Sequence, residues 1–138
     1  MKRYEQFSHT ADIGVRVFGK DLKELFENAA FAMFDIIADL ENISGDLLET
    51  FCLEAANNEE LLITWLDELL YTFYTKKLIF FKFQVDRIDG NRMTATAYAR
   101  PIDANRNRLK TEIKAATYSD LAIRDTGNGY EVEIIFDV

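Results

Sequence analysis

Two stretches in the first half of the chain repeat their apolar residues at helical spacing, and they constrain the fold more than any other feature. The first covers residues 21–39 and the second residues 59–75. Apolar residues that recur every three or four positions form one face of an amphipathic helix. Asp21, with Glu24 three residues later, is typical of a helix N-terminus. Asn57 or Asn58 is in the right place to begin the second helix. The sequence therefore predicts two long helices with apolar faces directed to a core.

The remaining segments alternate as β-strands do, with strands expected at residues 4–7, 13–18, 48–55, 78–88, 93–100, 110–123 and 130–138. Asp89-Gly90-Asn91 and the turn at residues 126–129 are hairpin signals. There is no internal repeat or linker. We therefore predict a single α+β domain over residues 1–138, with a mostly antiparallel or mixed β-sheet of about seven strands. Both amphipathic helices are expected to pack on one face of that sheet.

Composition narrows the functional classes. The 138 residues carry a formal net charge of −8, which disfavours autonomous binding to nucleic acid and favours a basic protein partner. No segment is long and apolar enough to span a membrane, and the first residues lack the apolar core of a signal peptide. Cys52 is the only cysteine. A reducing cytoplasm is therefore the expected location.

The carboxylates near the two ends of the sequence are the candidate site. Asp12 begins a predicted strand, and Asp137 is followed directly by Val138, whose terminal carboxylate is a second anionic group. If the fold brings Asp12 beside them, a hard cation such as calcium, magnesium or manganese would neutralise the converging charge. The alternative is a solvated strand end with a surface aspartate nearby. Spacing alone leaves both interpretations open.

Three other features have structural interpretations that compete with functional ones. His9 is the only histidine, and it fits a loop or core-edge residue as well as a metal or partner contact. Cys52 lies between Phe51 and Leu53 and is expected to be a packed thiol. Residues 100–110, followed by Lys114, are locally basic. They form either a solvated loop or a contact with a partner protein or an RNA phosphate.

Five short stretches together resemble the archease family, in that family's order and over nearly the whole chain. They are residues 9–14 (HTADIG), 25–30 (LFENAA), 65–71 (WLDELLY), 112–118 (EIKAATY) and 135–137 (IFD). The resemblance implies a small cytoplasmic α+β protein that is not itself an enzyme. It implies activation of the RNA-splicing ligase RtcB, by promoting guanylylation and multiple turnover and by broadening nucleotide use.

By position, the resemblance also implies a metal site at Asp12, Asp137 and Val138. Calcium is the ion expected first, with manganese or magnesium as alternatives. Association with tRNA is then indirect, through the ligase. Two positions depart from the family's pattern: Asn107 and Ser119 stand where histidines are common, which weakens any histidine-based role.

A rival hypothesis is a chaperone or specificity factor for an RNA-modifying enzyme, such as a tRNA methyltransferase, with a purely structural metal. A free-standing metal hydrolase has little support, because no nucleophile or general base accompanies the carboxylates in the sequence pattern. Metal dependence of the activity separates the activator hypothesis from the chaperone hypothesis.

Overall fold

The computed structural model describes residues 2–9 and 11–138, with the backbone alone at residue 9. In this part of the chain the elements are, in order, β1 (Tyr4–His9), β2 (Asp12–Gly19), α1 (Leu22–Ile37), β3 (Leu47–Glu54), α2 (Asn58–Lys76), β4 (Leu78–Asp89), β5 (Arg92–Pro101), the 3₁₀ helix η1 (Asp103–Arg108), β6 (Ala115–Thr117), β7 (Arg124–Asp125) and β8 (Tyr130–Asp137). None of the described helices has the length and apolarity needed to cross a lipid bilayer.

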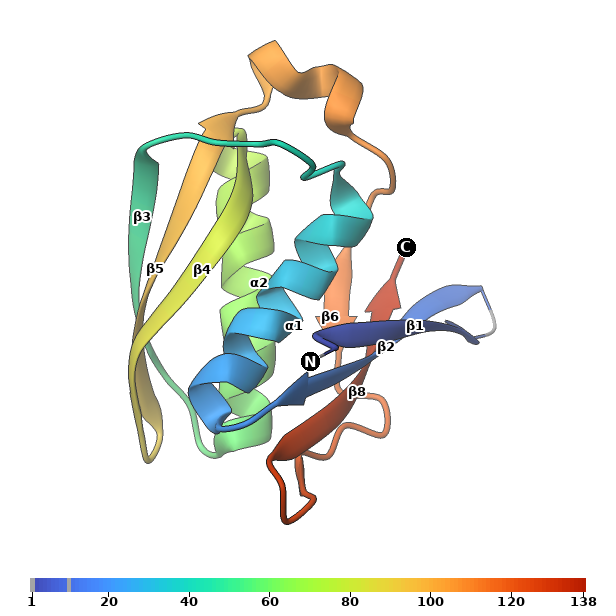
Figure 1. The fold of residues 1–138 in the computed structure, drawn as a ribbon, viewed down its shortest axis with the longest axis vertical. Coiled ribbons are helices and arrows are strands. Elements are labelled where there is room, and N and C mark those ends of the chain that lie inside the picture. Colours follow the sequence, from blue (N-terminus) through green and yellow to red (C-terminus); the bar gives the residue numbers. More distant parts are fainter. Residues whose placement is uncertain (1, 10) are drawn as a thin grey trace.

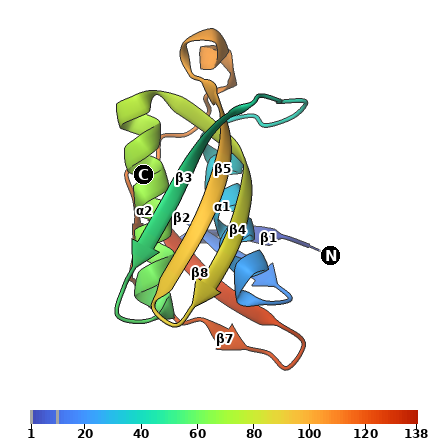
Figure 2. The same cartoon turned by 90° about the vertical axis from the view of Figure 1, so that its left-hand side faces the viewer.

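The strands form two antiparallel sheets with the helices between them (Figure 1). The three-stranded sheet has the order β3-β5-β4. The other has the order β1-β2-β8-β6, and β7 also pairs with β8. Helix α1 contacts β4 on one side and β2 on the other, while α2 contacts β3 and β6. Figure 2 looks onto the three-stranded sheet, with both helices behind it. Each sheet therefore has one face on the helices and one face outward.

The predicted α+β class, with antiparallel strands and two helices, is confirmed. The strands divide between two sheets instead of extending one. The reason lies in α1, which buries residues around most of its circumference, among them Phe26, Ala32 and Phe34. A helix that is apolar on several sides must be covered on several sides. Two sheets, one on either side of the helices, provide that cover.

Both helices begin where the sequence predicts. The Asp21 side chain accepts a hydrogen bond from the Glu24 backbone N–H, and the Glu24 carboxylate accepts one from the Lys20 N–H. Asn57 caps α2 in the same way, with its side-chain oxygen 2.8 Å from the Glu60 nitrogen. These bonds satisfy amide groups that the first turn of a helix leaves without a partner. The caps fix where each apolar face starts.

Aromatic side chains fill the space between the helices and the three-stranded sheet. The Phe34 ring of α1 lies 5.6 Å from that of Phe80, and the Trp65 ring of α2 lies 5.3 Å from that of Phe51. Phe34 and Trp65 are fully buried. The Trp65 indole N–H also donates to the Phe26 carbonyl, 3.1 Å away. The expectation that these apolar residues form core is confirmed.

The strand predicted over residues 110–123 is wrong for most of its length, since only Ala115–Thr117 pairs as a strand. Before it, the Lys110 N–H donates to the Ile37 carbonyl, so this segment crosses the end of α1. After it, Asp120 has a φ of 53° in a turn that the Leu121 N–H closes onto the Tyr118 carbonyl. Backbone groups bound to a helix end or a turn are unavailable to a sheet.

The prediction for Cys52 is also wrong, because its side chain is exposed. Successive side chains of a strand point to opposite faces. Phe51 is buried against the helices, so Cys52 faces outward from the three-stranded sheet. Phe51 and Leu53, its apolar neighbours in the sequence, therefore lie on the opposite face of the sheet.

A carboxylate of α1 binds the outer edge of β4. The ladder between β4 and β5 shifts register between Val85 and Arg87. At this bulge the Val85 N–H donates to the Glu27 carboxylate, with 2.8 Å between nitrogen and oxygen. Burial raises the pKa of Glu27 from its ordinary value of 4.5, and the bond from Val85 opposes that shift. The nearby carboxylates of Asp21 and Glu24 raise the pKa further.

This shift predicts a pH dependence of stability. Between pH 4.5 and the raised pKa, the folded state binds more protons at Glu27 than the unfolded chain does. The free energy of unfolding should therefore fall as pH rises through that window. Glu27→Gln keeps an oxygen for the Val85 N–H and removes the titration. In urea unfolding over a pH series, this variant should lose less stability than the wild type as pH rises from 4.5.

Glu54→Gln is the control, because it removes the same charge from an exposed carboxylate, 66% accessible, on β3. A Glu27→Gln variant whose pH profile matches those of the wild type and of Glu54→Gln would contradict this assignment.

Candidate functional site: carboxylates at the end of the five-stranded sheet

The structure brings Asp12 and Asp137 to the same end of adjacent strands. In the β2–β8 ladder Ile13 pairs with Phe136, and Gly14 pairs with Ile135. Continuing this antiparallel register by one residue sets Asp12 opposite Asp137. Opposed residues of such a pair project from the same face, with Cβ atoms about 4.5–5.5 Å apart. Val138 follows directly, so it lies at the same end.

These groups are accessible from solvent. Asp137 and Val138 are exposed, and Asp12 is half-buried. Within the described residues, no cluster of three or more His, Cys, Asp or Glu side chains could hold a metal ion. The Val138 carboxylate as a third ligand stays a prediction. Carboxylate oxygens are the donors that calcium, magnesium and manganese prefer, so the two aspartates fit such an ion in the chemistry of their donor atoms.

Strand β6 supports the end of β8 on the side away from β2. Ala115 pairs with Asp137, and the Lys114 N–H donates to the Asp137 carbonyl at 2.8 Å. The Thr117 hydroxyl donates to the Ile135 carbonyl, 3.0 Å away. Asp137 is thus held by β6, while the preceding residue, Phe136, pairs with β2 on the other side.

The sequence analysis did not identify Asp67, which lies on α2, as part of this site. In the structure the Asp67 carboxylate is half-buried and accepts the Ala116 N–H at 3.0 Å. Burial raises the pKa of Asp67, and the hydrogen bond from Ala116 opposes the shift. The helical spacing could have indicated that Asp67 faces inward. Ile63, four residues before Asp67, and Leu70, three residues after it, are both apolar and buried.

The stretches that carry the family resemblance come together here. Residues 9–14 lead into β2, residues 135–137 end β8, residues 112–118 contain β6, and residues 65–71 supply Asp67. Segments far apart in the sequence thus build one corner of the molecule. The prediction for His9 concerns a side chain outside the described part of the structure. Thr10 also lies outside it.

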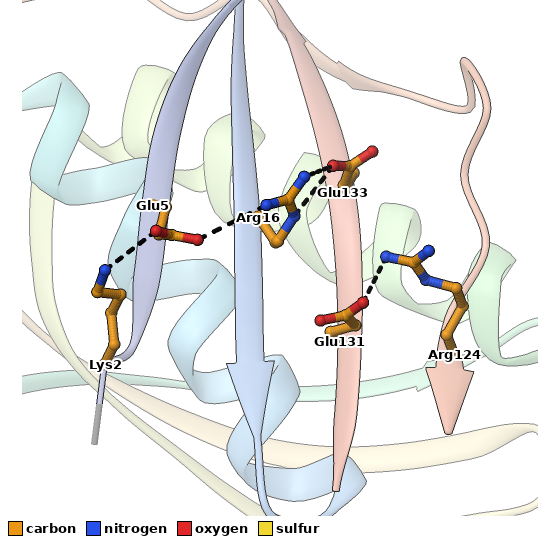
Figure 3. Close-up of polar contacts among 6 residues, drawn as sticks. All are labelled: Lys2, Glu5, Arg16, Arg124, Glu131 and Glu133. Carbon is orange, nitrogen blue, oxygen red and sulfur yellow. Dashed lines mark hydrogen bonds and ion pairs between the residues drawn. The ribbon is translucent and has the colours of Figure 1, made fainter. Parts of the chain in front are cut away.

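A ladder of ion pairs crosses the outer face of the same sheet (Figure 3). Arg16 on β2 lies between Glu133 on β8 and Glu5 on β1, with nitrogen–oxygen distances of 2.5 and 3.7 Å. The hydrogen bond to Glu133 is the main cause of the raised pKa of Arg16. The remaining pairs are Lys2 with Glu5 and Arg124 with Glu131. Exposed pairs contribute little stability. Their effect is that the positively charged side chains of these pairs are bound to carboxylates on the same face of the sheet.

The arginines of the basic segment bind the protein itself. The Arg108 guanidinium donates to the carbonyls of Asp39 and Glu41, each at 2.9 Å. Arg100 donates to the Ser44 carbonyl, and Arg106 forms an ion pair with Asp103. Arg108 thus ties η1 to the loop that follows α1, and Arg100 ties the end of β5 to the same loop. They favour the structural interpretation of the segment, while contact with a partner or an RNA phosphate stays a prediction.

Comparison with known proteins gives one consistent result. Residues 4–138 match the model of the archease protein family (MTH1598/TM1083). A protein archease of Methanosarcina barkeri is 40% identical over 141 aligned residues, covering 99% of this chain and 97% of that protein. One of Sulfurisphaera tokodaii is 34% identical over 140 residues, covering all of both. The solution structure of Methanobacterium thermoautotrophicum protein 1598 matches with a TM-score of 0.86 and 34% identity, over the full length of both chains.

Proposed function

Because this chain belongs to the archease family, we propose that it is an accessory activator of an RtcB-type RNA-splicing ligase and not itself an enzyme. In this proposal the protein promotes guanylylation and multiple turnover of the ligase and broadens its use of nucleotides. The observation that best supports it is the meeting of Asp12 and Asp137 at adjacent strand ends, next to the chain terminus. That corner is also where four of the five resembling stretches converge.

Asp12, Asp137 and the Val138 carboxylate are the groups that would hold a divalent cation, with calcium first and manganese or magnesium as alternatives. A bound cation supplies positive charge that neutralises phosphate oxygens of the nucleotide used in guanylylation. The three carboxylates provide hard oxygen donors at an exposed strand end, where a partner protein can reach them. In support of this set, Asp137 pairs with β6, and the β2–β8 register ends one residue before Asp12 and Asp137.

The charge of the chain fits a role beside the ligase better than direct binding to RNA. A net charge of −8 repels a phosphate backbone and attracts a basic protein. We therefore propose that contact with tRNA is indirect, through the ligase. We place this activity in the cytoplasm, whose reducing conditions keep the exposed Cys52 as a thiol.

Multiple-turnover ligation tests this proposal. A purified RtcB-type ligase would be given GTP, manganese, and RNA with a 2′,3′-cyclic phosphate and a 5′-hydroxyl end. We expect substoichiometric amounts of the chain to raise the number of turnovers per ligase. No stimulation of a cognate ligase would contradict the activator role. It would favour the chaperone hypothesis, which predicts improved solubility or specificity of an RNA-modifying enzyme instead.

A further inference from the structure

Strand β6 is short, yet it is the outer neighbour of the end of β8. Its three residues pair with Asp137, Phe136 and Ile135. A strand of this length gains little stability from its own ladder, since a few hydrogen bonds must offset the ordering of its backbone. Whatever holds β6 therefore also controls how firmly the last residues of β8 are placed.

Asp67 binds the side of β6 that faces away from β8. Its carboxylate accepts the Ala116 N–H at 3.0 Å, while Ala116 pairs with Phe136 on the other side. The carboxylate comes from the middle of α2, where the adjacent Leu66 is fully buried in the core. The bond is charge-assisted and half-buried, which makes it stronger than an exposed neutral one. Asp67 thus ties the short strand to a rigid helix.

We propose that Asp67 is a positioning residue for the carboxylate site: by holding β6 it fixes the end of β8, and so sets Asp137 and Val138 against Asp12. The proposal rests on the proposed function for the metal role of those three groups. The coupling itself is a property of the fold, because Lys114, two residues before Ala116, donates its N–H to the Asp137 carbonyl.

The chain contains a matched control for this role. Glu27 on α1 also accepts a backbone N–H at a sheet edge, with 2.8 Å to the Val85 nitrogen, but it does so in the three-stranded sheet. Glu27→Ala removes the same kind of bond and the same charge as Asp67→Ala. A role confined to general stability would make the two variants behave alike.

The experiment compares the wild type with Asp67→Ala, Asp67→Asn and Glu27→Ala. Calorimetric titration with manganese, and separately with calcium, measures metal affinity. Hydrogen exchange of the Lys114 amide reports on its bond to Asp137. We expect Asp67→Ala to lose at least about tenfold in metal affinity, the usual effect of removing a group that orients a ligand. Its Lys114 amide should exchange faster. Asp67→Asn keeps an acceptor oxygen and should retain affinity to within about threefold.

Glu27→Ala should leave both metal affinity and Lys114 exchange unchanged. Wild-type affinity in Asp67→Ala would overturn the proposal, and so would an equal loss in Glu27→Ala. If the wild type binds neither ion, the metal part of the proposed function fails and the exchange data alone decide. Faster Lys114 exchange in Asp67→Ala, but not in Glu27→Ala, would then support the positioning role, whereas equal exchange in both would overturn it.

Discussion

Replacement of Asp12 by alanine is expected to abolish stimulation of the ligase while leaving the fold intact. Asp12 and Asp137 lie at the shared end of β2 and β8. In the proposed site, removing Asp12 would leave a cation with Asp137 and the Val138 carboxylate alone. With one ligand of three gone, manganese or calcium affinity should fall by about 100-fold or more. Multiple-turnover ligation, run beside a calorimetric metal titration, measures both effects.

Glu54→Ala is the charge-matched control for this prediction. It removes one exposed carboxylate from the three-stranded sheet, where Glu54 forms an ion pair with Arg92. This variant should stimulate the ligase as the wild type does. If a folded Asp12→Ala protein also stimulates fully, the carboxylate mechanism is wrong and the chaperone hypothesis, with a purely structural metal, becomes the better account.

The largest expected effect on stability is that of Trp65→Ala. The Trp65 ring is fully buried, and its indole N–H bonds to the Phe26 carbonyl. The substitution leaves a cavity between α2 and the three-stranded sheet and removes the partner of a carbonyl on α1. Such large-to-small changes cost about 3–5 kcal/mol, a large part of the 5–15 kcal/mol that holds a typical domain together.

Tyr71→Ala provides the comparison, because Tyr71 lies on the same helix and its residue surface is 63% exposed. It should change the free energy of unfolding by well under about 1 kcal/mol. Urea unfolding should be followed by circular dichroism, since Trp65 is the only tryptophan and its loss removes the tryptophan fluorescence. Similar losses in the two variants would show that the core is not organised around Trp65.

The elements that could be predicted from the sequence are those governed by local rules. The apolar periodicity of α1 and α2, their caps at Asp21 and Asn57, and the hairpin at Asp89-Gly90-Asn91 all depend on residues close together in the chain. Gly90, with a φ of 60°, occupies the backbone conformation that this turn requires. Such signals can be recognised without knowing the surfaces against which each helix or strand packs.

The features that could not be predicted depend on pairings between distant segments. Residues 110–114 resemble a strand, but they do not pair as one, and Lys110 binds the end of α1 instead. Cys52 resembles a core residue until the helices are placed on the Phe51 side of β3. Division of the strands into two sheets follows from the surroundings of α1, which no single window of sequence shows. For the same reason Asp67 was missed, because its role depends on the position of β6.

In the candidate site, too, the local features could be predicted and the pairing of distant segments could not. The sequence alone identifies Asp12 and Asp137 as carboxylates at strand ends. Only the β2–β8 register brings the two aspartates together. Their metal role stays a prediction for the titrations to test.

The outward position of Cys52 has a practical consequence. It is the only thiol of the chain, and it lies on the outer face of the three-stranded sheet, with both helices between that sheet and the one bearing the carboxylates. A fluorophore or spin label can therefore be attached to the wild-type protein, without engineered cysteines. Energy transfer from that label to one on the ligase would measure how close the two proteins come and in which orientation they meet.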